Sequence, residues 1–86
     1  MEITITPQGK ETEKNYFNNQ WLTIKPFKSN IIGLSLCLQN ANGLGKRIPM
    51  TDTDEILVKE NISDFGYFWF EYSTCDIEYK LTVTIE

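Results

Sequence analysis

The sequence predicts a single all-β domain, an antiparallel sandwich of six or seven strands. Three observations predict this fold class. Apolar residues recur with a period of two along most of the chain, turn-forming residues interrupt the alternation at short intervals, and only one short segment has helical character. With 86 residues the chain has room for one hydrophobic core and not for two, so we expect residues 1–86 to form one domain.

Seven segments have the alternation expected of strands. In chain order they are residues 2–6, 16–25, 32–38, 48–50, 56–58, 67–72 and 77–86. The last is the most regular, because every second residue from Ile77 to Ile85 is apolar or aromatic and those between are polar. Pro, Gly and Asn residues between the segments favour turns. A helix is possible only in residues 9–19, where Glu and Lys favour it and a run rich in Asn opposes it.

Residues 56–86 resemble the E, F and G strands of immunoglobulin-like domains. In that family the E strand leads into a corner of the form Asp-x-Gly-x-Tyr-x-Cys, and Asp64, Gly66, Phe68 and Phe70 stand at its four defined positions. Phe replaces both the Tyr and the Cys of that pattern. The resemblance implies an immunoglobulin-like sandwich rather than the alternative, a small five-stranded barrel. By analogy of fold alone, it also implies a binding or structural role.

The same aromatic segment is similar to the RNA-binding strand of RNA-recognition domains, in which outward rings stack on bases. In residues 63–70 the aromatic spacing partly matches, but Ser63 and Asp64 replace the leading basic residue and glycine of that motif. Acidic residues at Asp64, Glu71 and Asp76 would repel phosphate. Nucleic acid is therefore disfavoured as a partner.

The composition argues against catalysis. The chain has no His, which removes the commonest general base and the commonest transition-metal ligand. The acids that follow Asp52 lack the Gly and Glu spacing of an EF-hand calcium loop. We therefore expect a protein that is not an enzyme and that uses no metal and no cofactor.

No apolar run is long enough to span a membrane, and residues 1–6 lack the basic and apolar regions of a signal peptide. The sequence thus predicts a cytoplasmic protein that does not bind membranes, with Cys37 and Cys75 as free thiols. Its residue usage, rich in Asn, Ile and Lys, suggests an AT-rich genome such as that of a low-GC bacterium or its phage.

Strand parity selects the candidate binding residues. If Phe68 and Phe70 face the core, then Tyr67, Trp69 and Glu71 face outward. Trp21 also faces outward, because its neighbours Leu22 and Ile24 take the core side. Outward Trp and Tyr are good interface anchors, although a loop that folds over this face would bury the rings.

Charge adds a second group of candidates. Residues 51–86 carry nine acidic and two basic side chains, whereas residues 1–50 carry three acidic and six basic ones, and the net charge is −4. The acids cluster before the aromatic strand, as a solvated loop or as a surface for a basic partner. The full set of candidate partner-binding residues is Trp21, Asp52, Asp54, Glu55, Glu60, Asp64, Tyr67, Trp69 and Glu71.

Together these features predict a non-enzymatic protein-binding domain, a small acidic inhibitor or adaptor that acts on a basic partner protein, for example by presenting carboxylates where phosphates would lie. The alternative is a structural assembly module, such as a virion decoration or appendage domain, that associates with itself through exposed aromatic residues. A homodimer is compatible with either function.

Overall fold

The computed structural model describes residues 1–18, 20–50 and 58–86. In these residues the chain forms ten strands and no helix. In chain order the strands are β1 (Glu2–Ile5), β2 (Asn15–Tyr16), β3 (Trp21–Ile24), β4 (Ile31–Ile32), β5 (Ser35–Gln39), β6 (Gly45–Pro49), β7 (Val58–Asn61), β8 (Tyr67–Glu71), β9 (Thr74–Cys75) and β10 (Tyr79–Ile85).

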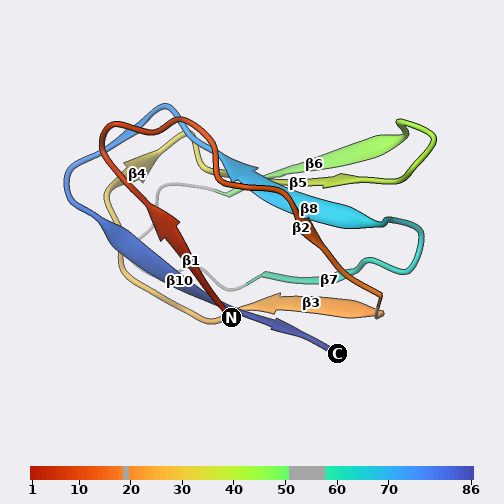
Figure 1. The fold of residues 1–86 in the computed structure, drawn as a ribbon. Coiled ribbons are helices and arrows are strands. Elements are labelled where there is room, and N and C mark those ends of the chain that lie inside the picture. The colour runs from red at the N-terminus through yellow and green to blue at the C-terminus, as the bar shows by residue number, and fades with distance from the viewer. Residues whose placement is uncertain (19, 51–57) are drawn as a thin grey trace.

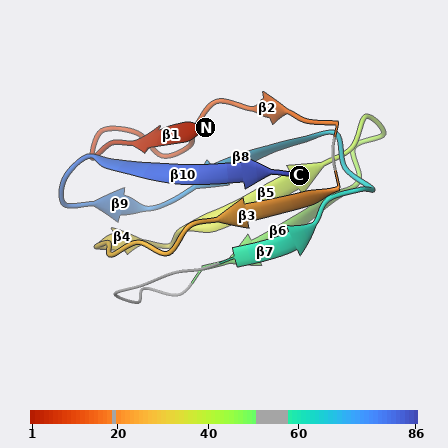
Figure 2. The same cartoon turned by 90° about the horizontal axis from the view of Figure 1, so that it is seen from below.

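Two four-stranded antiparallel sheets make up the sandwich. The first has the order β1-β10-β3-β7 and the second the order β2-β8-β5-β6, while β4 and β9 pair separately. Figure 1 shows the two sheets as the lower and upper layers of the molecule, and both termini belong to the lower one. Figure 2 shows β10 enclosed between β1 and β3.

The strand pairing is that of a jelly roll. Strands of the first half pair with strands of the second half in nested order, as β5 with β6, β3 with β7, β2 with β8, and β1 with β10. This long folded hairpin is then rolled up, which adds the contacts of β3 with β10 and of β5 with β8. Eight strands in two sheets with this connectivity define a jelly roll.

The core lies between the sheets and follows from the period of two. On β8, Phe68 and Phe70 point inward and are fully buried, and on β3 the inward residues are Leu22 and Ile24. The rings of Phe68 and Phe70 meet edge to face with centroids 6.1 Å apart. Burial of a Leu, Ile or Phe side chain stabilises the fold by about 1.5–3 kcal/mol. The remaining fully buried large residues are Ile5, Ile31, Leu34, Leu36, Leu38, Ile62, Leu81 and Val83.

The predicted antiparallel sandwich is confirmed, and within the described ranges the sheets do not close into a barrel. Seven of the described strands have four or more residues, and six or seven strands were predicted, although the predicted segments 48–50 and 56–58 overlap β6 and β7 only at their ends. The place of the last strand differs from the immunoglobulin-like order, in which it lies in the sheet of the F strand. Here β10 lies between β1 and β3, opposite the sheet that contains β8.

The possible helix at residues 9–19 is wrong, because no described residue of this segment is helical. The segment instead runs along the edge of β8. Thr12 N–H donates to the Phe70 carbonyl at 2.9 Å, and Phe17 N–H donates to the Gly66 carbonyl at 3.1 Å. The free edge of β8 offers backbone hydrogen bonds to this segment, and these outweigh the modest helix propensity of Glu and Lys.

Candidate functional site

The outer side of the second sheet carries a group of aromatic and charged side chains. We call this surface the aromatic face. Its members are Lys14, Tyr16, Gln39, Arg47, Tyr67, Trp69 and Glu71, with Cys37 at its floor. Cross-strand pairing brings them together from four separate stretches of chain, because Tyr16 pairs with Tyr67, and Trp69 pairs with Cys37, which in turn pairs with Arg47.

Three rings form a row across β2 and β8. The ring centroids of Tyr16 and Tyr67 are 5.5 Å apart, and those of Tyr67 and Trp69 are 5.8 Å apart with planes inclined by only 22°. Tyr16 is 80% exposed, while the other two rings are partly covered. Rings in contact on a hydrogen-bonded sheet lose little conformational entropy when a partner binds, so the row is preorganised.

Hydrogen bonds hold the rings in place. The Tyr67 hydroxyl donates to Gln39 Oε1 at 2.6 Å, and the Trp69 indole Nε1 donates to Glu71 Oε2 at 2.9 Å. The polar ends of Tyr67 and Trp69 are thus fixed by neighbours on the sheet.

Glu71 is the charged centre of the aromatic face. Arg47 donates from its guanidinium to Glu71 Oε1 at 2.7 Å, and Trp69 donates to the other oxygen. These two hydrogen bonds, with that of Arg47 the larger effect, lower the pKa of Glu71 below its usual value. Glu71 therefore stays ionised at neutral pH and keeps Trp69 and Arg47 in register across the sheet.

A lysine ammonium lies over the rings. Lys14 Nζ is 5.1 Å from the centroid of Trp69 and 5.7 Å from that of Tyr67. Both distances are within the range in which the negative face of an aromatic ring attracts a cation.

Cys37 pairs with Trp69 across the sheet and is only 3% exposed. Burial, followed by the negative charge of Glu71, raises the pKa of this thiol to about 11. A thiol with a raised pKa is a poor nucleophile, so Cys37 is a packing residue of the aromatic face. Cys37 and Cys75 are both free and buried.

Thiol labelling of Cys37 should therefore distinguish the native protein from the denatured protein. In a Cys75→Ser variant, whose one thiol is Cys37, we expect a disulfide reagent at pH 8 to react at least about 100-fold more slowly with native than with denatured protein, because the native thiolate fraction is far smaller. Because folding raises this pKa, the free energy of unfolding has its full value below the unfolded pKa of about 8.5. It falls as the pH rises from there through the folded pKa of about 11. Equal labelling rates would contradict the burial.

A depression of about 350 Å³ lies beside Trp69, over β5 and β6. Two of the residues that line it are small, namely Gly45 on β6 and Cys37 on β5, which pairs with the large Trp69 on β8. Its other lining residues are Leu38, Gln39, Lys46 and Arg47. Within the described part of the chain, no group of three or more Cys, Asp or Glu residues is placed to hold a metal ion. The side chains of the face offer stacking, hydrogen bonding and charge pairing.

The predicted candidates fall into separate places. Tyr67, Trp69 and Glu71 lie together on the aromatic face, with the outward parity that the sequence predicted. Trp21 has the predicted parity too, but it lies on the outer side of the first sheet, so the two tryptophans do not share a surface. Lys59 Nζ is 5.3 Å from its ring centroid.

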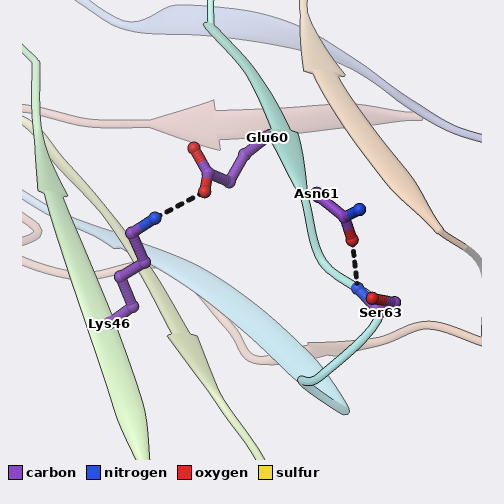
Figure 3. A network of polar contacts seen from close by, with 4 residues as sticks. All are labelled: Lys46, Glu60, Asn61 and Ser63. Atoms are coloured by element: carbon purple, nitrogen blue, oxygen red, sulfur yellow. Dashed lines mark hydrogen bonds and ion pairs between the residues drawn. The ribbon is translucent and has the colours of Figure 1, made fainter.

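The predicted acidic segment is only partly described. Asp52, Asp54 and Glu55 lie outside the described residues. Glu60 on β7 forms an ion pair with Lys46 on β6 at 2.5 Å, which joins the edges of the two sheets (Figure 3). Asp64 is exposed in the turn before β8.

Four members of the aromatic face were not predicted from the sequence, namely Lys14, Tyr16, Gln39 and Arg47. They come from three other stretches of chain, and only the strand register shows that they meet Tyr67 and Trp69. For Arg47 a weak signal existed, since it is the one arginine of the chain and lies in a segment that alternates.

Comparison with protein-family profiles, with curated proteins and with solved structures finds no significant match to this chain. Among the described residues there is no helix of the length and hydropathy needed to cross a membrane.

Proposed function

We propose that this chain is a non-enzymatic binding domain that recognises a basic protein partner through the aromatic face. The observation that carries the proposal is the row formed by Tyr16, Tyr67 and Trp69 on one side of the sheet, in which hydrogen bonds hold Tyr67 and Trp69 in place. Trp, Tyr and Arg are the residues that most often dominate the affinity of protein interfaces.

Carboxylates beside the aromatic face support a basic partner, whereas the charged members of the face itself, Lys14 and Arg47 against Glu71, sum to +1. Glu71 remains ionised between Arg47 and Trp69. Glu11, in the neighbouring segment, pairs with Glu71 through an antiparallel backbone bridge. Exposed Asp64 lies in the turn that leads into the same strand. Carboxylates at the edge of an interface chiefly raise association rates and select the partner.

The finer form of the proposal is an inhibitor or adaptor of bacterial or phage origin that acts in the cytoplasm. It is supported by the acidic balance and by residue usage. The second candidate is an assembly module, favoured by the exposure of Tyr16, which leaves the end of the aromatic row open to a second copy.

The test compares two exposed residues. We expect Tyr16→Ala to reduce capture of the partner from lysate, while Ile77→Ala, which removes an exposed side chain that lies outside the face, leaves it unchanged. Capture of the wild type should weaken at high salt, because screening shortens the range of the charges. The oligomeric mass is measured in parallel. If Tyr16→Ala dissociates a homo-oligomer whose mass is insensitive to salt, the assembly module is the better function, and if neither measurement responds, the aromatic face is not a binding surface.

A further inference from the structure

The rings of the aromatic face form a site for a cation, and that site is already filled from within the chain. Lys14 Nζ lies near the faces of both Tyr67 and Trp69, whose planes are nearly parallel. We propose that the Tyr67–Trp69 pair binds an ammonium or guanidinium group of the basic partner, and that Lys14 is an internal competitor that must leave first. This inference rests on the proposed function and specifies its central contact.

The two ring faces are the feature of this surface that favours positive charge. The Trp69 indole donates to the ionised Glu71, which fixes the ring and places a carboxylate at its edge. Arg47 also faces this region, and its ion pair with Glu71 at 2.7 Å compensates both charges. The attraction for a cation therefore comes from the two ring faces, which together attract an ammonium group more strongly than either ring alone.

Lys14 is held weakly enough for an incoming cation to displace it from the rings. It is exposed and lies in the stretch before β2. Among the described residues no carboxylate forms an ion pair with it, whereas Lys46 and Arg47 each have one. Its attraction to the rings is that of an exposed cation–π contact, so its release should reduce the affinity of an incoming cation by about two- to fivefold.

The chain supplies its own matched control. Lys59 lies over Trp21 on the opposite sheet, but there a single ring of the described residues contacts the ammonium group. Removal of Lys14 should therefore change cation binding at Trp69 alone, and removal of Lys59 should not affect that site.

The experiment titrates ¹⁵N-labelled protein with choline and follows the indole N–H resonances of Trp69 and Trp21. The neutral probe is 3,3-dimethylbutan-1-ol, which has the shape of choline without its charge. We expect Lys14→Met to increase the affinity for choline at Trp69 by about two- to fivefold, with Lys14→Gln giving the same result. In contrast, Lys59→Met should leave the affinity at Trp69 unchanged, and the neutral probe should bind much more weakly.

Three outcomes would overturn the inference: choline fails to shift Trp69 in Lys14→Met, the neutral probe shifts it equally, or both Lys14 variants bind choline as the wild type does. The titration needs no protein partner. A negative titration would therefore leave the proposed function intact. Loss of capture in Tyr16→Ala would then still support a binding face, one that recognises something other than a cation.

Discussion

Phe68→Ala is expected to lower the free energy of unfolding by about 3–5 kcal/mol, the range for truncation of a buried Phe. Phe68 is 0% exposed, and its ring lies between those of Phe70 and Phe17, at centroid distances of 6.1 and 5.8 Å. It belongs to β8, an inner strand of the second sheet that lies between β2 and β5. Since a domain of this size is stable by only about 4–13 kcal/mol, the variant loses a large part of its stability.

Urea unfolding followed by circular dichroism measures this loss. Phe68→Leu serves as a milder variant that stays folded, and Ile77→Ala, at a residue that is 58% exposed, should change stability by less than about 0.5 kcal/mol. A loss below about 1 kcal/mol for Phe68→Ala would contradict its position in the core.

The inward position of Phe68 is the kind of fact that sequence alone could predict. In a strand, alternate side chains face opposite sides, so the burial of Phe68 and Phe70 determines that Tyr67, Trp69 and Glu71 face outward. The same parity placed Trp21 outside and Leu22 inside on β3. Sheet faces follow from local alternation and need no knowledge of neighbouring strands.

Strand order could not be predicted in this way. The alternation of β10 is the same whether it pairs with β8 or lies between β1 and β3, as it does here. Pairing partners are set by contacts between residues distant in the chain, such as Thr84 with Thr23. For this reason the sequence placed both tryptophans in one candidate site, although the two sheets separate them.

The composition of the aromatic face is a consequence of that long-range pairing. Arg47 meets Glu71 only because β5 lies between β6 and β8. Lys14 reaches the rings only because the segment before β2 follows β8 in an extended conformation, where local propensity allowed a helix. The local sequence does not show which charged residues lie next to an aromatic strand in space.

Trp69→Ala is expected to separate binding from stability. Hot-spot truncations cost about 2 kcal/mol or more, so affinity for the captured partner should fall at least about 30-fold. Because the ring lies on the outer side of the sheet and is only partly covered, the loss of stability should be smaller than that of Phe68→Ala. Trp21→Ala is the matched control, since it removes a similarly covered indole from the opposite sheet and should leave affinity unchanged.

The thiol of Cys37, the cross-strand partner of Trp69, provides an internal check on this variant. We expect removal of the ring to expose Cys37, which should then react with a disulfide reagent faster than in the wild type while the fold remains intact by circular dichroism. Isothermal titration measures the affinity, and labelling in the Cys75→Ser background measures the uncovering. If Trp69→Ala unfolds the protein outright, the indole is a core residue, and if it folds with unchanged affinity and a faster thiol, the ring covers Cys37 without contributing to recognition.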